Sequence, residues 1–204
     1  MSPYARPTVN TSPATAFHPP SFAREPRWHP ATGWHLRKAP GELQPWLVSK
    51  DSLTQRLIKA SEGHFQVQLL VAGWQRPQHN ECRLLGLGDD EYAFVRQVYL
   101  LGREQVWVYA RSVIPHATTR GPLKSLTRLG NRPLGEILFT NPRIRRGRLQ
   151  IARIVPGQAM YNEASRHGEL SRSPLWGRRS LFWLQQHPLL VSEIFLPAIA
   201  ETQT

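Results

Sequence analysis

The sequence predicts an α+β fold in which a six-stranded antiparallel sheet carries helices along one side. Six segments rich in β-branched and aromatic residues are bounded by glycine, proline or polar clusters, as strands usually are. Two of them are separated only by the short turn at residues 102–104, which favours a hairpin and therefore antiparallel pairing. The six predicted strands cover residues 65–74, 91–101, 105–115, 148–156, 179–186 and 189–197.

Helices are predicted before the first of these strands and between the third and the fourth. Ser52 is followed three residues later by Gln55 and then by an apolar stripe, so a capped helix should start at about Leu53. Residues 121–130 and 132–141 predict two short helices. The first would end at its final glycine, and the second would carry its proline, Pro133, at the first helical position.

Two parts of the chain lack such patterns. Nine of the eighteen prolines fall in the first 45 residues, where neither helix nor strand periodicity is present. Residues 1–38 are therefore expected to be a disordered, Pro-rich extension ahead of one domain at residues 39–204. Residues 156–174 carry helix formers between prolines but little apolar surface, which indicates an exposed insertion or a flap.

Composition narrows the possible classes of protein. The 204 residues, 40% of them hydrophobic, suffice for one core. No apolar run reaches the roughly 18 to 20 residues of a membrane span, and the N-terminus lacks the apolar segment of a secretion signal, so a cytoplasmic protein is expected. Cys82 is the single cysteine and cannot form an internal disulfide, and the eight histidines show no metal-ligand spacing. No metal site is expected.

The net charge of +12 fits nucleic acid, an anionic surface or a small anionic substrate as the partner. Nine arginines against two glutamates give residues 141–180 a charge of +7, which is most of this excess. No zinc finger, RNP-type aromatic motif or basic zipper accompanies these arginines. A solvated basic surface is therefore favoured, and a nucleic-acid partner is not expected.

Two opposite charges fall on apolar faces of predicted strands. Alternation along residues 91–101 places Arg96 on the apolar face, and along residues 189–197 it does the same for Glu193. The two could form a buried salt bridge that fixes the sheet, although such pairs often contribute little net stability. They could instead flank a cavity and hold the two ends of a polar ligand, with the arginine binding a carboxylate. Both interpretations remain open.

Three further groups are candidates for ligand binding. Arg111 shares its face with Trp107 and Tyr109 and could be a third inward charge, although packing or pairing with an acid is the favoured interpretation. The backbone N–H groups at Leu53 and Leu134 lie at predicted helix starts, where they lack internal partners and favour anions. An inward arginine, an inward glutamate and spare backbone donors together suit a small aromatic or cyclic acid.

Several motifs occur together in the order and spacing of one family. The segments DSLTQRL, AFVRQVYL, ARSVIP, LGNRPLGEILFT, LWGRRSLF and HPLLVSEIFLP resemble the bacterial chorismate pyruvate-lyases over about residues 41–199. The long patterns LG-x-x-PLG-x-x-LFT, LWGRRS and PLL-x-x-E-x-FLP make the match specific. The resemblance implies a six-stranded antiparallel sheet and an enzyme without metal or cofactor. Such an enzyme converts chorismate to 4-hydroxybenzoate and pyruvate, the first step towards ubiquinone.

The resemblance also assigns roles to residues of this chain. It implies that Arg96 and the backbone amides of Leu53 and Leu134 bind the ring carboxylate, while Glu193 faces the ring hydroxyl. Family members often carry Met at the position of Leu53, a nearly neutral difference because the contact is a backbone amide. The chain is expected to act as a monomer, with chorismate, 4-hydroxybenzoate and pyruvate as ligands. The remaining candidates, for the pyruvyl carboxylate, are Arg111, Arg178 and Arg179.

Two other functions compete with this one. The same fold serves as a non-catalytic effector domain that binds small molecules in some transcription regulators. Those regulators carry a helix-turn-helix ahead of the domain, which the proline-rich first 40 residues could not form. A nucleic-acid-binding protein would instead use the arginines of residues 141–180.

Overall fold

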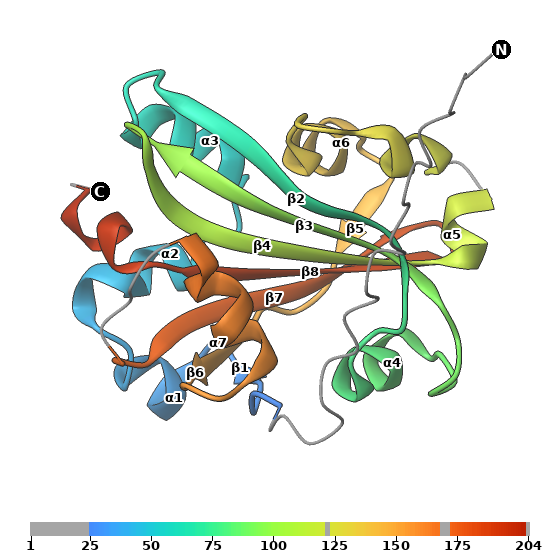
Figure 1. The fold of residues 1–204 in the computed structure, drawn as a ribbon, viewed down its shortest axis with the longest axis horizontal. Helices are drawn as coiled ribbons and strands as arrows, with labels where there is room; N and C mark the ends of the chain where they lie inside the picture. Colours follow the sequence, from blue (N-terminus) through green and yellow to red (C-terminus); the bar gives the residue numbers. More distant parts are fainter. Residues whose placement is uncertain (1–24, 121–122, 168–171, 203–204) are drawn as a thin grey trace, which may run out of the picture.

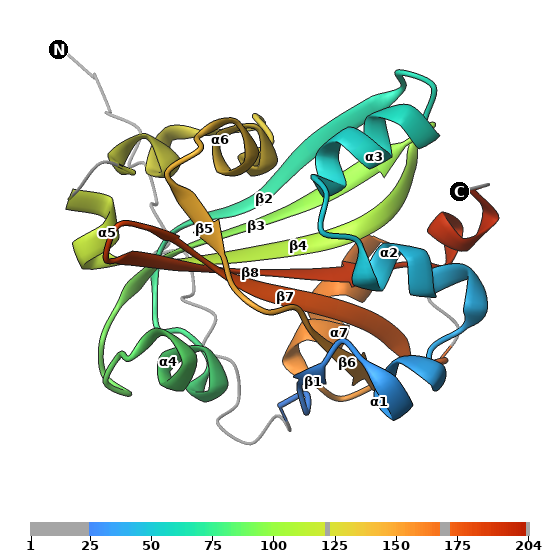
Figure 2. The ribbon, with the colours of Figure 1, turned by 180° about the vertical axis from the view of Figure 1, so that it is seen from behind.

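One twisted antiparallel sheet runs through the molecule, and helices pack on both of its faces (Figures 1 and 2). The computed structural model describes residues 25–120, 123–167 and 172–202. The strand order is β1-β6-β7-β8-β4-β3-β2, and β5 pairs with β7 beside this path. The strands are β1 (His29–Pro30), β2 (Phe65–Gln75), β3 (Ala93–Gly102), β4 (Gln105–Pro115), β5 (Ile144–Arg146), β6 (Gln150–Ile154), β7 (Leu175–Leu184) and β8 (His187–Phe195).

The helices are short and lie between the strands in the chain. The α-helices are α1 (Gly33–Arg37), α2 (Gln44–Val48), α3 (Leu53–Ala60), α4 (His79–Leu85), α5 (His116–Arg120), α6 (Leu134–Thr140) and α7 (Ala159–Ala164). The 3₁₀ helices are η1 (Gly41–Leu43), η2 (Lys124–Arg128), η3 (Ser165–His167) and η4 (Pro197–Glu201).

All six predicted strands are present, as β2, β3, β4, β6, β7 and β8. The structure adds β1 and β5, which are too short to show a sequence pattern of their own. It also starts β7 at Leu175, four residues before the predicted start at Arg179. The LWGRRS motif therefore lies within a central strand, where its two arginines point to opposite faces.

The predicted hairpin joins β3 to β4 through a two-residue turn. Arg103 and Glu104 have φ angles of 51° and 66°, as the type I′ turns that fit the twist of a hairpin require. Gly102 remains in β3, and the ring of Trp107 occupies the space where a β-carbon of this residue would lie. The turn residues are thus not the usual glycine or asparagine, and the glycine instead makes room for a tryptophan.

The predicted start of α3 is confirmed. The Ser52 hydroxyl accepts a hydrogen bond from the Gln55 amide at 3.4 Å, and Leu53 is the first helical residue. The second predicted start is correct to one residue, because Pro133 is the N-cap and α6 begins at Leu134.

The helices divide between the two faces of the sheet, whereas the sequence predicted them on one side. We call the face covered by α2, α3, η2 and α6 the α3 face, and the face covered by α4 and α7 the α4 face. The difference arises partly from α4, which begins with a capping box between Gln78 and Glu81 that the sequence reading missed. Leu85 of α4 packs against Val95 and Val113 of the sheet.

Two segments predicted to lie outside the fold are partly built into it. Residues 1–24 of the predicted extension lie outside the described residues, but the remainder forms β1, which pairs with β6, and α1. In the predicted flap, Met160 and Ala164 of α7 are buried in one cluster with Tyr99 and Tyr109 of the sheet. This half of the segment is therefore packed on the α4 face. Residues 168–171 lie outside the described residues, and a flap there stays a prediction.

Candidate active site

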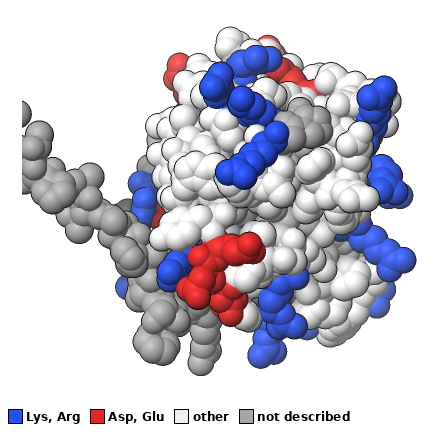
Figure 3. All heavy atoms as spheres, turned by 90° about the vertical axis from the view of Figure 1, so that its right-hand side faces the viewer, with Lys and Arg blue, Asp and Glu red and all other residues white. Residues whose placement is uncertain are grey.

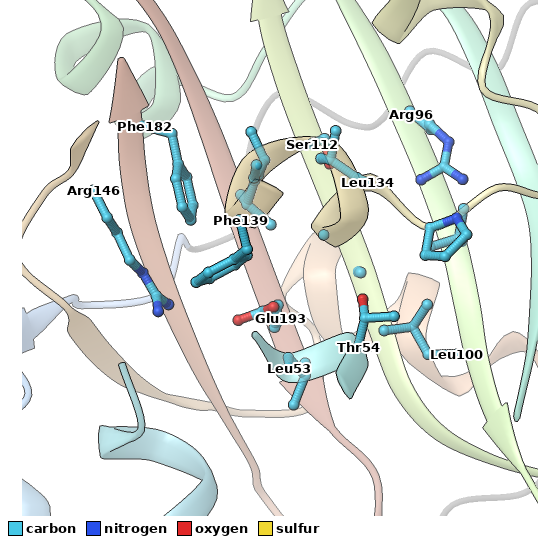
Figure 4. Close-up of a pocket in the computed structure, with 16 residues that line it drawn as sticks. Leu53, Thr54, Arg96, Leu100, Ser112, Leu134, Phe139, Arg146, Phe182 and Glu193 are labelled. Carbon is cyan, nitrogen blue, oxygen red and sulfur yellow. The ribbon is translucent and has the colours of Figure 1, made fainter. Parts of the chain in front are cut away.

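A pocket lies on the α3 face, between the sheet and the starts of α3 and α6 (Figure 4). It opens where two apolar clusters of the core meet, one around α3 and one around α6. Its lining is largely apolar with a few charged groups, as expected of a small-molecule site. The lining residues are Leu53, Thr54, Arg96, Val98, Leu100, Ala110, Ser112, Pro133, Leu134, Gly135, Leu138, Phe139, Arg146, Phe182, Val191 and Glu193.

Arg96 is held in the pocket wall by backbone carbonyls. It is only 4% exposed, and its Nη2 donates to the carbonyl oxygens of Gly130 at 2.9 Å and Arg132 at 2.8 Å. Its buried Nε has no hydrogen-bond partner, and Arg96 forms no ion pair with any described acid. Burial lowers the pKa of the guanidinium to about 10, which reflects the cost of keeping this cation from water. An anionic ligand would remove that cost.

Glu193 has an arginine partner, but it is Arg178 and not Arg96. Arg178 lies directly across from it on β7, and its Nε donates to Glu193 Oε2 at 2.5 Å. Arg178 is 1% exposed, and its Nη1 also donates to the carbonyls of Trp46 and Ser49 at 2.7 and 2.9 Å. The bond from Arg178 uses Oε2, and Oε1 accepts no hydrogen bond from any described residue. Arg96 and Glu193 therefore both line the pocket without contacting each other.

The starts of α3 and α6 meet at one side of the pocket. Leu53 and Leu134 are the first residues of these helices, and their amides have no partner within the helix. The two helix starts approach closely at Gly135, where a β-carbon would lie 2.5 Å from the Thr54 hydroxyl oxygen. Glycine is therefore needed here for the two sets of backbone donors to lie side by side.

Arg146 is a pocket residue that the sequence reading missed, because it seemed part of a solvated basic run. It comes from β5, and its Nε donates to the Ser180 hydroxyl at 3.1 Å while Nη1 donates to the Lys50 carbonyl at 3.0 Å. The guanidinium carbon lies 5.6 Å from the ring centre of Phe139 and 5.3 Å from that of Phe182. Burial lowers its pKa to about 10, although the charge of nearby Glu193 opposes this shift.

Arg111 lies on the α4 face, away from the pocket. Its Nε and Nη2 donate to the two carboxylate oxygens of Glu81 at 2.8 and 2.9 Å, and both side chains are buried. Burial lowers the pKa of the guanidinium, but the charge and hydrogen bonds of Glu81 outweigh this and hold the pKa above its ordinary value. The sequence favoured packing or pairing with an acid for Arg111, and the structure shows that it pairs with Glu81.

Arg179 also lies on the α4 face. Its Nε donates to Gln150 Oε1 at 2.8 Å, its Nη1 donates to Asn80 Oδ1 at 2.5 Å, and its guanidinium carbon lies 4.6 Å from the ring centre of Trp28. Neither Arg111 nor Arg179 can therefore bind a ligand in the pocket. Arg178 shares the α3 face with the pocket, but it reaches the site through its contact with Glu193 rather than as a lining residue.

The described residues contain no group of three or more His, Cys, Asp or Glu side chains that could hold a metal ion. None of the helices in this part of the chain is long and apolar enough to cross a membrane.

Comparison with known proteins identifies related chains over most of the length. A family model described as chorismate lyase matches residues 24–203. A protein of Thiobacillus denitrificans named probable chorismate pyruvate-lyase is 45% identical over 169 residues, which cover 82% of this chain and 90% of that protein. One of Methylococcus capsulatus with the same name is 42% identical over 157 residues, covering 77% of this chain and 96% of that protein.

Solved structures resemble the fold at low sequence identity. The effector domain of PhnF from Mycobacterium smegmatis superimposes with a TM-score of 0.54 and 13% identity, over 74% of this chain and 91% of that one. A GntR-family transcriptional regulator from Bacillus cereus gives a TM-score of 0.52 and 11% identity, over 69% and 97%. At this level of identity the likeness shows a shared α+β fold.

Proposed function

We propose, since this chain belongs to the chorismate lyase family, that it converts chorismate to 4-hydroxybenzoate and pyruvate in the pocket between α3 and α6. The observation that carries the proposal is the buried Arg96, which faces this pocket and is not paired with any acid that the structure describes. A buried cation of this kind is costly unless an anion binds to it. The ring carboxylate of chorismate is such an anion.

The reaction needs orientation more than reactive groups. In chorismate the C3–O bond to the enolpyruvyl group breaks and the hydrogen at C4 is lost, so the ring becomes aromatic. The leaving enolpyruvate takes up one proton to become pyruvate, and this proton balances the one lost from C4. Because aromatisation drives this step, a site that fixes the ring and polarises its substituents can supply most of the acceleration.

The residues divide into those that hold the ring carboxylate and one that holds the hydroxyl. Arg96 and the amides of Leu53 and Leu134 bind the carboxylate, combining a charge with unpaired backbone donors. Glu193 accepts a hydrogen bond from the C4 hydroxyl through Oε1, while Arg178 keeps the other carboxylate oxygen in place. Apolar residues of the lining enclose the ring and exclude water, which strengthens these contacts.

A non-catalytic role remains the main alternative, because two regulator domains share the fold. Such a domain would bind an aromatic acid in the same pocket and leave chorismate intact. Relatives named probable chorismate pyruvate-lyase, at 42% and 45% identity, favour the enzyme.

Nucleic-acid binding has less support. Figure 3 shows lysine and arginine side chains in separate groups around a broad uncharged area, with an acidic group among them, and not as one continuous basic surface on this face. Binding of this type depends on a positive patch or stripe that follows the phosphate backbone. We also propose that the chain acts in the cytoplasm as a monomer, without a metal or a cofactor.

The test is to mix the purified protein with chorismate and to follow both pyruvate and 4-hydroxybenzoate. We expect equimolar formation of the two products, unaffected by a metal chelator. Binding of 4-hydroxybenzoate without turnover would support the regulator-like alternative. Salt-sensitive binding to random DNA, unchanged by chorismate, would support the nucleic-acid alternative.

A further inference from the structure

Arg146 has no role in the contacts proposed so far, although it lines the same pocket as Arg96. Figure 4 shows the two arginines on opposite sides of the pocket, with Glu193 between them in this view. They come from β5 and β3, which lie on either side of β7, β8 and β4 in the sheet. The two guanidinium groups therefore enter the pocket from opposite sides.

Arg146 is positioned in a way that leaves donors free. Its two described hydrogen bonds, to Ser180 and Lys50, use two of the five guanidinium N–H groups. Its guanidinium carbon also lies 5.6 Å from the ring centre of Phe139 and 5.3 Å from that of Phe182. It is half-buried, and it forms no ion pair with any acid among the described residues. The cation is therefore oriented and partly desolvated, but not neutralised.

The charges of the pocket indicate the charge of its ligand. Glu193 is the acid of the lining, and its carboxylate is paired with Arg178. Arg96 and Arg146 remain as two cations without acidic partners in the part of the chain that the structure describes. A ligand with two separated carboxylates would neutralise both, whereas a ligand with one carboxylate would leave one cation unpaired.

We propose that Arg146 binds the carboxylate of the enolpyruvyl group of the substrate. This assignment rests on the proposed function and extends it to a second anion subsite at the Arg146 side of the pocket. Arg146 thereby selects a dianionic substrate over the monoanionic aromatic product, which keeps only the carboxylate at Arg96. The assignment replaces the three candidates for this carboxylate that the sequence suggested.

The test compares substrate and product in an Arg146→Gln variant of the full chain. Loss of one hydrogen-bonded charge contact should lower kcat/KM for chorismate by about 10- to 100-fold. The Kd for 4-hydroxybenzoate, measured by calorimetry, should change by less than about threefold, because this ligand has no second carboxylate. Arg145→Gln is the matched control, since this exposed neighbour on β5 loses the same charge outside the pocket. The control should change neither quantity.

The outcomes separate the subsite from other roles of Arg146. If Arg146→Gln weakens substrate and product equally, the residue acts on the ring end or on the fold, and the assignment is wrong. If kcat/KM stays within about threefold of the unchanged chain, the assignment is also wrong. Failure of the unchanged chain to cleave chorismate would instead overturn the proposed function. Arg146→Lys, which retains the charge but not the planar fork, should recover part of the loss.

Discussion

Arg178 and Glu193 face each other on neighbouring strands, with Arg178 Nε 2.5 Å from Glu193 Oε2. The same guanidinium also donates to the carbonyls of Trp46 and Ser49, in the segment that leads into α3. One arginine thus connects the acid of the pocket to the chain that supplies the Leu53 amide. Glu193 thus forms a partly buried ion pair through Oε2. In the function proposed above it has a second role, because its Oε1 accepts a hydrogen bond from the ligand.

Replacing Glu193 with Gln should separate its role in the ion pair from its proposed role in turnover. The amide oxygen can still accept from Arg178, so the free energy of unfolding should fall by only about 1 to 3 kcal/mol. Turnover of chorismate should fall by at least about 100-fold, because the hydroxyl loses a charged acceptor. Absorbance of 4-hydroxybenzoate measures turnover, and urea unfolding measures stability. Glu136→Gln, at an exposed position of α6, is the control and should retain full turnover. Full turnover of the Glu193 variant would contradict the assignment.

Replacing Arg96 with Met should affect binding far more than stability. The variant loses two hydrogen bonds to carbonyls, but it also removes a buried cation without an acidic partner among the described residues, and apolar replacements of buried charges are often tolerated. We expect the free energy of unfolding to fall by no more than about 2 kcal/mol. The affinity for 4-hydroxybenzoate, measured by calorimetry, should fall by about 100-fold. An unchanged affinity would show that the ring carboxylate binds elsewhere.

Gly135 tests whether the helix starts must lie side by side. In Gly135→Ala the new β-carbon would meet the Thr54 hydroxyl oxygen, and we expect α3 and α6 to separate and the two amides to move apart. We expect the affinity for 4-hydroxybenzoate to fall by about 10-fold, as for one lost charge-assisted hydrogen bond. Adding Thr54→Ala removes the obstructing hydroxyl and should restore most of the affinity. If the double variant is as weak as the single one, close approach of the helices is not the cause.

Replacing Glu81 with Gln tests whether the α4 face contributes to ligand binding on the α3 face. Glu81→Gln leaves the buried Arg111 without its charged partner, which should lower the free energy of unfolding by about 3 kcal/mol. Affinity for 4-hydroxybenzoate, measured below the unfolding transition, should change by less than about threefold. Glu62→Gln removes an exposed pair with Arg103 and should change stability by less than about 1 kcal/mol. A large loss of product affinity on changing Glu81 would mean that the α4 face supports the site directly.

Much of the site was predictable because strand alternation is a local rule. Parity placed Arg96 and Glu193 on apolar faces, and the capping signature at Ser52 gave the start of α3. Parity does not show which face of a strand meets which partner. It could not assign Arg111 to the α4 face, because the acid that neutralises it, Glu81, lies 30 residues away on a helix that the sequence reading missed.

The positions of Arg146 and Arg178 show a second limit of prediction from the sequence. Arg146 belongs to a strand of three residues inside a basic run, where no alternation can be read, and only its pairing with β7 turns it inward. Arg178 was placed ahead of a strand that in fact begins at Leu175, so its face was not assigned. Pairing across the sheet, and not the local pattern, decides the position of both.

Because Arg178 and Arg179 point to opposite faces of the sheet, insertions and deletions in β7 should be poorly tolerated. Inserting or deleting one residue in β7 just before Arg178 would exchange the faces of these two arginines and leave Glu193 without its partner. A one-residue insertion or deletion in β3, β4 or β8 could likewise turn their pocket residues to the opposite face. Length variation should therefore accumulate in connections such as the one between η3 and β7, while these four strands retain their spacing.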